Sequence, residues 1–303
     1  RRFGGNQLAV ILDADGLETA QMQAIAREFN YSETTFVLRP EDPGNTARVR
    51  IFTPATEVPF AGHPNVGTGH VLASLQRDAA RPESFVFEEE AGLVEVSLRW
   101  NGEEVDEVRI TAPETLSTGS RFPAAQLAAC LSLDLADIAT GQHLPLIASI
   151  GLPFLVVEIA SRAALRAARP DIAAISKILP AEGADAIYLY CRETEAEDGE
   201  VDLSARMFAP WDGVPEDPAT GSATGAACAL IAGIGGSTTT PVRFRGLRAG
   251  SHRRDRSLTL PPGMHGNERH SSGPLRCRKK ETPPGGRAVP GGGASDATGV
   301  GSV

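Results

Sequence analysis

The spacing of apolar positions predicts a mixed succession of strands and helices through residues 1–112. Residues 17–29 place apolar side chains near every 3.6 positions, which is typical of an amphipathic helix. A helix of small residues is expected to follow Gly62-His63-Pro64 and to run to about 75. Short apolar or alternating runs predict strands. They lie at 7–12, 34–38, 47–53, 84–90, 93–100 and 107–110.

A second series of elements begins after a segment at 113–119 that is rich in Ser, Thr, Gly and Pro and is expected to be a linker. Helical patterns are expected at 124–139, 161–168 and 171–178, and strands at 145–149, 154–159, 186–191 and 202–208. The sequence EDPATGSATGA at 216–226 then opens another helix of small residues. We therefore expect a second domain over 120–240.

The two domains resemble each other in the order of their parts. Each has strands, then a Gly-rich turn, then a helix of small residues, and the turns read PFAGHPNVGTG and EDPATGSATGA. A weak repeat of this size predicts a pseudo-symmetric pair of α+β domains. The unpaired N–H groups and the partial positive charge at a helix start favour the binding of a carboxylate there. Tight packing of helix on sheet is the alternative explanation for either turn.

Composition excludes several classes of protein. Residues 1–240 carry 17 Lys and Arg against 34 Asp and Glu, and an acidic body argues against nucleic-acid binding. No apolar run approaches the roughly 20 residues of a membrane span, and the N-terminal residues do not have the pattern of a signal peptide. Cys130, Cys191, Cys228 and Cys277 are scattered, without metal-ligand spacing, and are expected to be buried small residues. A cytoplasmic location is expected.

Residues 241–303 differ from the rest of the chain. They carry 12 Lys and Arg against 4 Asp and Glu, and the apolar alternation gives way to Arg, Gly and Pro. One interpretation is a disordered basic tail that binds an acidic partner, even a nucleic acid. We prefer a reading-frame change near 236–245 in the source gene, because out-of-frame translation of GC-rich DNA gives such a composition. Resequencing the gene tests this, and an uninterrupted frame with related tails in homologues would refute it.

Three polar side chains are the candidates for chemistry. Glu33 lies between a helix end and an apolar strand, where desolvation would raise its pKa and suit it to act as base and then as acid. His63 stands at the first Gly-rich helix start and Asp217 at the second. Each also has an ordinary interpretation: a solvated turn glutamate, a helix-start histidine bonded to backbone, and an N-capping aspartate.

Four segments occurring together carry a family resemblance. They are Gly5-Asn6-Gln7-Leu8-Ala9-Val10, Asn30-Tyr31-Ser32-Glu33-Thr34-Thr35-Phe36, Phe60-Ala61-Gly62-His63-Pro64 and Asp217-Pro218-Ala219-Thr220-Gly221-Ser222-Ala223. In this order and at these spacings, residues 3–235 resemble the phenazine-biosynthesis PhzF-like isomerases, which share the diaminopimelate-epimerase fold. The resemblance implies two domains, each a β-sheet wrapped around a central helix, with the active site between them.

The resemblance also implies roles for particular residues. Glu33 matches the family's acid/base glutamate, and His63 and Asp217 match the other catalytic positions. No metal or organic cofactor takes part in the family's reaction, which moves a proton on a small carboxylate-bearing substrate. Substrate-binding positions are implied at Ser32, Gly62, Gly221 and Ser222.

Alternatives to a glutamate-based isomerase remain open at this point. The same cleft could hold a small acid without catalysis. A two-base epimerase of the two-cysteine kind is disfavoured, because Cys228 lies more than two turns into the second predicted helix. The expected partners are a small-molecule substrate and a second copy in a homodimer, with neither nucleic acid nor membrane. A first strand that the family usually has is missing before 7–12, which predicts an open edge in the first sheet.

Overall fold

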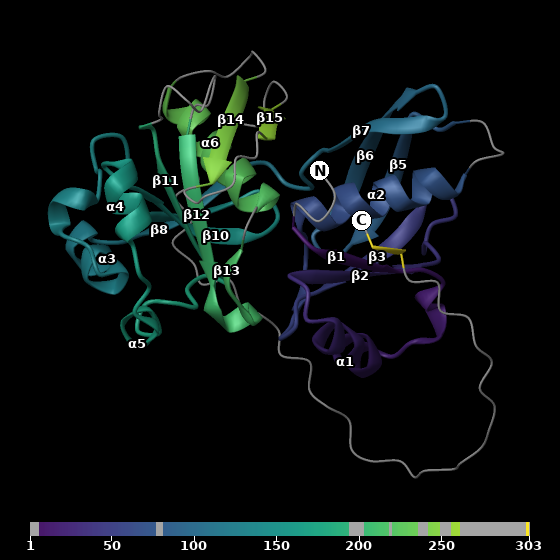
Figure 1. Cartoon of the computed structure of the whole chain (residues 1–303), viewed down its shortest axis with the longest axis horizontal. Helices are drawn as coiled ribbons and strands as arrows, with labels where there is room; N and C mark the ends of the chain where they lie inside the picture. The colour runs from purple at the N-terminus through teal and green to yellow at the C-terminus, as the bar shows by residue number, and fades with distance from the viewer. Residues whose placement is uncertain are drawn as a thin grey trace, which may run out of the picture.

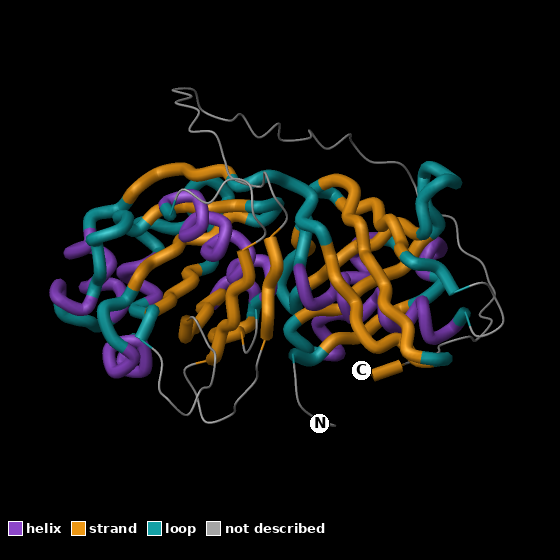
Figure 2. The backbone as a smooth tube through the Cα atoms, turned by 90° about the horizontal axis from the view of Figure 1, so that it is seen from above, coloured by secondary structure: helices purple, strands orange, loops and turns teal. Residues whose placement is uncertain are grey.

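The computed structural model describes residues 6–76, 81–193, 203–217, 220–235, 242–248, 256–260 and 301–302. The chain forms two lobes side by side, one from each half of the sequence (Figure 1). Viewed from above, strands surround a helix in each lobe (Figure 2). This is the expected α+β architecture of two sheets, each wrapped around a central helix.

The first lobe is a mixed sheet with one helix inside it and one outside. Along the sheet the order is β16-β1-β2-β3-β5-β6-β7, and β4 pairs with β3. The strands are β1 (Leu8–Ile11), β2 (Glu33–Leu38), β3 (Ala47–Phe52), β4 (Glu57–Val58), β5 (Ser84–Glu89), β6 (Gly92–Asn101), β7 (Glu104–Ile110) and β16 (Gly301–Ser302). The helices are α1 (Thr19–Phe29) and α2 (Gly62–Leu75), with a 3-10 turn at Ala14–Gly16.

Small residues allow α2 to run close to the sheet. A Cβ added to Gly67 would lie 2.4 Å from Leu8 of β1, and one added to Gly69 would lie 2.8 Å from Val96 of β6. Apolar side chains of β1, β3, β5 and β6 pack with the helix into one core. On the other face, Met22 and Ala26 of α1 pack on Phe36 and Phe52 in a smaller core.

The second lobe is built in the same way. Its sheet has the order β15-β14-β12-β11-β10-β9-β8, and β13 pairs with β12. The strands are β8 (Ser117–Arg121), β9 (Leu146–Ser149), β10 (Pro153–Glu158), β11 (Ile187–Cys191), β12 (Leu203–Ala209), β13 (Val214–Asp217), β14 (Val242–Arg248) and β15 (Arg256–Leu260). The helices are α3 (Ala124–Leu131), α4 (Arg162–Ala167), α5 (Ile172–Ile175) and α6 (Gly221–Ile234), with 3-10 turns at Leu135–Asp137 and Pro210–Asp212.

Helix α6 is the central helix of this lobe and is almost entirely buried. Its alanines pack against β9 to β12, while α3, α4 and α5 cover the opposite face with a separate core. Cys228 lies in the first of these cores and Cys130 and Cys191 in the second, as expected for buried small residues. Cys277 lies outside the described residues.

Strand pairing shows that the two lobes repeat one topology. In the first, β1–β2 is parallel, β2–β3 and β3–β4 are antiparallel, β3–β5 is parallel and β5–β6 is antiparallel. The second lobe has the same five orientations in the same order. Its strand pairs are β10–β11, β11–β12, β12–β13, β12–β14 and β14–β15. The central helices α2 and α6 follow β4 and β13 respectively. The repeat suggested by the two Gly-rich turns is therefore a repeat of the whole fold.

Several local expectations are corrected by the structure. The edge at β1 is not open, because β16 pairs antiparallel with it. The expected linker ends early, since Ser117 begins β8, and the expected helix at 124–139 is α3 followed by a 3-10 turn. Within the predicted tail, 242–248 and 256–260 form strands. The rest of that tail, apart from 301–302, lies outside the described residues.

No helix among the described residues is long and apolar enough to cross a membrane.

Candidate active site

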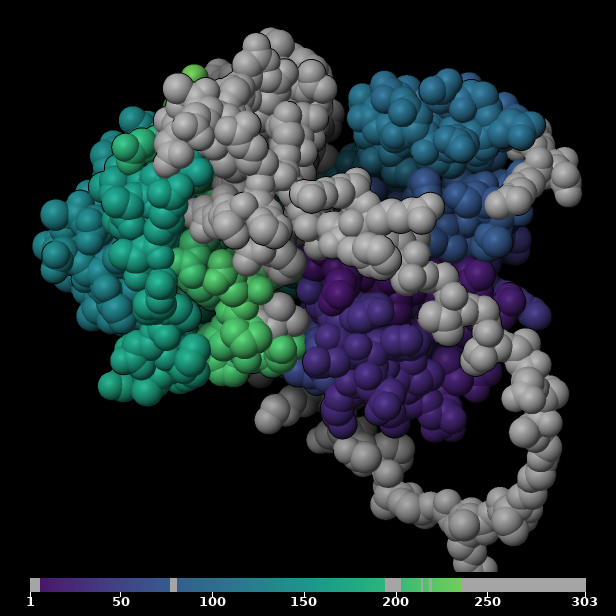
Figure 3. Space-filling model, in the orientation of Figure 1, coloured from purple at the N-terminus to yellow at the C-terminus, as the bar shows by residue number. Residues whose placement is uncertain are grey.

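The N-termini of the two central helices meet where the lobes contact each other. Helix α2 begins at Gly62 and α6 at Gly221. A Cβ added to Gly62 would lie 3.0 Å from the backbone nitrogen of Ser222 and 3.2 Å from Cα of Gly221. A side chain here would push the two backbones apart, so glycine suits this close approach. The arrangement brings two partial positive charges to one place between the lobes. In Figure 3, green atoms of the second half lie against purple atoms of the first half.

Glu33 and His63 face each other beside these helix starts. Glu33 is the first residue of β2, where parallel pairing with Leu8 fixes the strand end, and His63 is the second residue of α2. His63 Nε2 lies 3.3 Å from Glu33 Oε2, and the two side chains are only 10% and 15% exposed. Burial, followed by the charges of Asp217 and Asp212, raises the pKa of Glu33 well above its ordinary value of 4.5. Glu33 is thus a desolvated carboxyl and not a solvated turn residue.

Asn6 connects this pair to Asp217 in the other lobe. Its amide Nδ2 donates to Asp217 Oδ1 at 2.6 Å and lies 3.3 Å from His63 Nδ1. Because an amide nitrogen only donates, Nδ1 of His63 is the acceptor, and the neutral ring carries its proton on Nε2, towards Glu33. The Thr220 hydroxyl donates to the second oxygen of Asp217. A polar chain therefore runs from Glu33 through His63 and Asn6 to Asp217.

A small cavity of about 20 Å³ lies between the lobes next to Glu33. A volume of this size holds roughly one water molecule, so the cleft is closed. The cavity is lined by Ser32, Glu33, Thr53, Met207, Ala209, Asp212 and Asp217. Burial and the charge of Asp185 raise the pKa of Asp212 to about 7. Three carboxyl groups thus line one small cavity.

The structure brings all seven residues singled out from the sequence to this region. Ser32, Glu33 and Asp217 line the cavity and His63 contacts Glu33. The other three form the junction of helix starts. They are Gly62, Gly221 and the buried Ser222.

Asn6, Thr53 and Asp212 were not among the sequence candidates. Asn6 belongs to a motif that carried the resemblance, but its partners are 57 and 211 residues away. Thr53 and Asp212 belong to turns that follow β3 and β12 and that share a pattern. The two stretches read FTPATEVP at 52–59 and FAPWDGVP at 208–215. Comparing these stretches would have directed attention to both turns.

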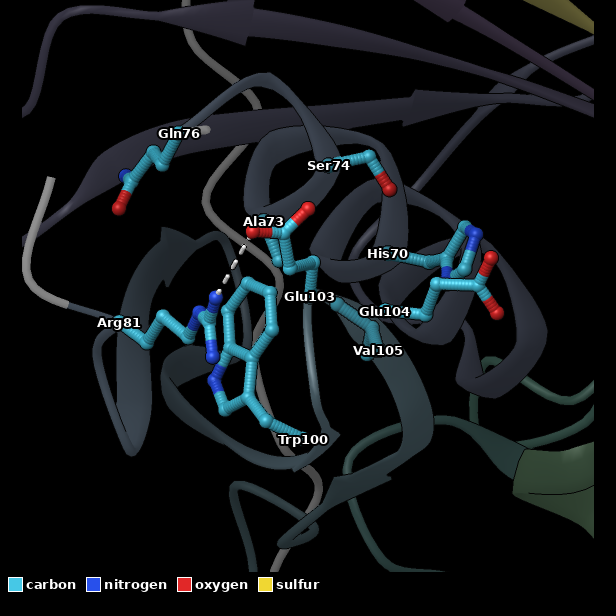
Figure 4. Close-up of a pocket in the computed structure, with 9 residues that line it drawn as sticks. All are labelled: His70, Ala73, Ser74, Gln76, Arg81, Trp100, Glu103, Glu104 and Val105. Atoms are coloured by element: carbon cyan, nitrogen blue, oxygen red, sulfur yellow. Dashed lines mark ion pairs between the residues drawn. The ribbon is translucent and has the colours of Figure 1, made fainter. Parts of the chain in front are cut away.

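A larger cavity lies at the far end of α2, away from the helix junction. It measures about 510 Å³ and is lined by His70, Ala73, Ser74, Gln76, Arg81, Trp100, Glu103, Glu104 and Val105 (Figure 4). Arg81 is held there by Glu103 at 3.7 Å and by the Trp100 ring, 5.9 Å from its guanidinium carbon. None of the predicted site residues lines this cavity, so the interdomain cleft is the candidate active site.

Two lobes of repeated topology, with a closed acidic cleft at the junction of their central helices, define the diaminopimelate-epimerase-like class of folds. A hydroxyproline epimerase from Agrobacterium vitis has this architecture: the two structures match with a TM-score of 0.55 at 12% identity, over 81% of this chain and 73% of that one. At this identity the likeness shows the fold alone.

Closer relatives specify the family. The model for PhzC-PhzF, described as phenazine biosynthesis-like protein, matches residues 1–257. The chain is 40% identical over 237 residues to an uncharacterized isomerase of Mesorhizobium japonicum, covering 76% of each chain. It is 37% identical over 223 residues to the trans-2,3-dihydro-3-hydroxyanthranilate isomerase of Pseudomonas aeruginosa, covering 73% of this chain and 72% of the relative.

A solved structure shares this fold. The Bacillus anthracis phenazine biosynthesis protein of the PhzF family matches with a TM-score of 0.69 at 24% identity, over 86% of this chain and 85% of that one. The chain belongs to the PhzC/PhzF phenazine biosynthesis-like family. It is an enzyme of the isomerase type.

Proposed function

We propose that this enzyme isomerises a small carboxylate-bearing substrate by proton transfer, with Glu33 as the acid/base group. The observation that carries the proposal is the position of Glu33: buried, raised in pKa, facing His63 and lining the cleft between the lobes. A solvated glutamate is too weak a base to deprotonate a carbon acid at a useful rate. A desolvated one with a raised pKa is better matched to that task near neutral pH.

The reaction divides into two proton transfers. The ionised Glu33 carboxylate takes a proton from a carbon next to the substrate's conjugated system: the C–H bond breaks, an O–H bond forms and the electron pair enters that system. The resulting neutral Glu33 then returns the proton to a different carbon. One carboxyl serves both steps, so protons and electrons balance without a co-reactant.

The surrounding groups support the intermediate charge. The starts of α2 and α6 direct backbone N–H groups and partial positive charge to the helix junction, where a substrate carboxylate would gain negative charge after deprotonation. Neutral His63, with its proton on Nε2, stabilises the Glu33 carboxylate when that group is ionised. Asn6 and Thr220 fix Asp217 at the other wall of the cleft.

Substrate entry requires the lobes to separate. The closed cleft has room for about one water molecule, whereas pockets for small organic ligands measure roughly 300 Å³ or more. Closure around the substrate would then exclude water and bring Asp212 and Asp217 of the second lobe against a substrate held by Glu33 of the first.

The test is solvent deuterium incorporation. The relative from P. aeruginosa is named for its action on trans-2,3-dihydro-3-hydroxyanthranilate, and we take that compound and a panel of small amino acids as probes in D₂O. We expect the wild type to incorporate deuterium into at least one probe and Glu33→Gln to lose roughly 10²–10⁴-fold of that rate. Glu28→Gln, an exposed change on α1, is the matched control and should behave as wild type.

Binding measurements separate the main alternative. If both wild type and Glu33→Gln bind a probe equally and neither exchanges protons, the protein holds a small acid without catalysis. Unchanged exchange in Glu33→Gln would remove Glu33 from the mechanism.

A further inference from the structure

Strand β13 brings Asp217 to the cleft, although few residues pair it with the sheet. Among the described strands it pairs with β12, and the ladder joins Met207 to Asp217 and Ala209 to Val214, with a break in register between them. Met207 and Asp217 both line the cleft cavity, so Asp217 lies on the cleft face of β13. Because successive side chains of a strand point to opposite faces, Glu216 lies on the other face. A contact that holds Glu216 there therefore also bears on the position of Asp217.

Arg206 of β12 holds Glu216 through two hydrogen bonds at once. Nε of Arg206 donates to Glu216 Oε1 at 3.0 Å, and Nη2 donates to Oε2 at 2.8 Å. The arginine side chain is 9% exposed and the glutamate side chain 28%. A planar guanidinium matches the two oxygens of a carboxylate, so this pair fixes the direction of the Glu216 side chain as well as its distance.

The guanidinium of Arg206 is also anchored on its other side. Nη1 donates to the carbonyl oxygens of Leu165 and Ala168, at the C-terminal end of α4, each at 2.9 Å. Carbonyl groups at the end of a helix lack partners within the helix and carry partial negative charge, which favours a cation. Cζ of Arg206 lies 4.7 Å from the centre of the Phe208 ring. Arg206 thus joins β13 to the helices that cover the outer face of the sheet.

The first lobe has an equivalent arginine. The stretches at 50–59 and 206–215 read RIFTPATEVP and RMFAPWDGVP, so that Arg50 stands where Arg206 does. Its guanidinium also lies over a phenylalanine ring and binds both oxygens of one carboxylate, that of Glu57, each at 2.7 Å. The pairing of this arginine with an acid on the short neighbouring strand is therefore part of the repeated fold.

The position of the acid differs between the two lobes. Gly213 is the second-lobe equivalent of Glu57 and supplies no carboxylate. The acid is instead Glu216, directly before Asp217. In the first lobe, residues 58–61 separate Glu57 from the start of α2. The ion pair of the second lobe is thus connected to the cleft more directly than its first-lobe counterpart.

We propose that Arg206 is a positioning residue for the reaction: by holding Glu216 on the outer face of β13, it sets the place of Asp217 in the cleft. The inference rests on the proposed function, because it assigns Arg206 to that same site. The charge of Asp217 is one of the causes that raise the pKa of Glu33. The position of Asp217 can therefore be followed through the pKa of Glu33 in the protein without substrate.

Titration of Glu33 by ¹³C NMR tests this without any reaction. Labelling the glutamate carboxyl carbons gives the signal, and its loss in Glu33→Gln assigns it. Arg206→Lys keeps the charge but cannot bind both oxygens of Glu216 as a guanidinium does. We expect Asp217 to move away from Glu33 in this variant and the Glu33 pKa to fall by roughly 0.5–1, a fraction of the effect of a charge within about 4–6 Å. Arg50→Lys, the same change in the first lobe, should leave the Glu33 pKa unchanged.

Further variants protect the test against misfolding and against an indirect effect. Glu216→Asp also keeps both charges while shortening the acid, and it should lower the Glu33 pKa as Arg206→Lys does. Circular dichroism and thermal unfolding check that each variant folds. In an Asp217→Asn background neither change should lower the Glu33 pKa further, because the charge through which both act is gone. An unchanged Glu33 pKa in either folded variant, an equal shift in Arg50→Lys, or a shift that persists in the Asp217→Asn background would overturn the proposal.

Proton exchange connects this position to turnover. In Arg206→Lys the kcat for deuterium incorporation should fall about tenfold or more, as for a misplaced group of the active site, while Arg50→Lys should exchange as the wild type does. Wild-type kcat in Arg206→Lys, with Glu33→Gln inactive, would overturn the positioning role. A lowered Glu33 pKa in Arg206→Lys together with unchanged exchange in Glu33→Gln would contradict the proposed reaction and leave the placing of Asp217 by Arg206 standing.

Discussion

The carboxyl of Glu33 shows how one residue acquires its chemistry from its surroundings. The strand end places it next to a helix start, burial removes water, and Asp217 and Asp212 add negative charge. Burial and the charges of Asp217 and Asp212 raise its pKa, and His63 Nε2 lies 3.3 Å from its Oε2. Glu33 is thus poised to exchange a proton and not fixed in either state.

The pH dependence of proton exchange follows from that raised pKa. Only ionised Glu33 is a base, so kcat/KM should rise with pH along a limb that lies well above pH 4.5, the ordinary value for a glutamate. Asp212→Asn removes one of the charges that raise the Glu33 pKa, so its limb should lie at lower pH. A wild-type limb near pH 4–5, or no shift in the variant, would contradict the electrostatic account. The measurement is a pH profile of deuterium incorporation for both proteins.

Glu89 gives a second pH effect, on stability. It ends β5, and burial, partly opposed by the amide of Asn65, raises its pKa to about 8. The folded state therefore holds the Glu89 proton more tightly than the unfolded state, and this contribution to stability is lost as pH rises from about 4.5 to about 8.

Glu89→Gln should remove that loss. We expect the variant and the wild type to be similar in stability at pH 5. Above pH 8 the variant should be more stable by up to roughly 5 kcal/mol, since the pKa is raised by about 3.5 units and each unit corresponds to 1.36 kcal/mol. Urea unfolding at both pH values measures the difference, with Glu95→Gln as the exposed control. Equal stability of Glu89→Gln and wild type above pH 8 would show that the Glu89 carboxylate is solvated.

At the scale of elements, the decisive contact is that between the starts of α2 and α6. Gly62→Ala would place a methyl group 3.0 Å from the backbone nitrogen of Ser222, which cannot move aside as a flexible side chain can. We expect the helix starts to separate by a few tenths of an ångström and proton exchange to fall about tenfold or more, with the fold retained. Gly16→Ala, where an added Cβ meets nothing within 4 Å, is the control for the exchange assay. Wild-type activity in Gly62→Ala would mean that this contact does not set the geometry of the site.

Elements with a strong local pattern could be predicted from the sequence. The apolar strands β2, β10, β11 and β12 and the small-residue helices α2 and α6 were expected, because buried elements leave runs of apolar or small residues. Strand β3 was expected from its alternation of polar and apolar residues. Strand β4, with two residues, carries too few positions for a pattern. The acidic cleft could not be predicted from the sequence either. Asn6 and Asp217 are 211 residues apart in the chain, and Asp212 looks like an ordinary turn residue.

At the scale of the whole molecule, the repeated topology explains where the second sheet ends. Strands β14 and β15 occupy the places that β5 and β6 have in the first lobe. The family match also continues to residue 257, into β15. The basic composition after 240 thus begins within the repeated fold. We propose that a reading-frame change accounts for the composition of the tail. Such a change would affect activity through the second lobe, which supplies Asp212 and Asp217.

The central claim is that Glu33 removes a proton and returns it to a different carbon. The most direct measurement is NMR of trans-2,3-dihydro-3-hydroxyanthranilate, or of whichever probe exchanges, after incubation in D₂O with wild type, Glu33→Gln and Glu28→Gln. The account predicts deuterium at a new carbon with wild type and Glu28→Gln and almost none with Glu33→Gln, although that variant still binds the probe. Deuterium incorporation by Glu33→Gln at the wild-type rate would contradict it.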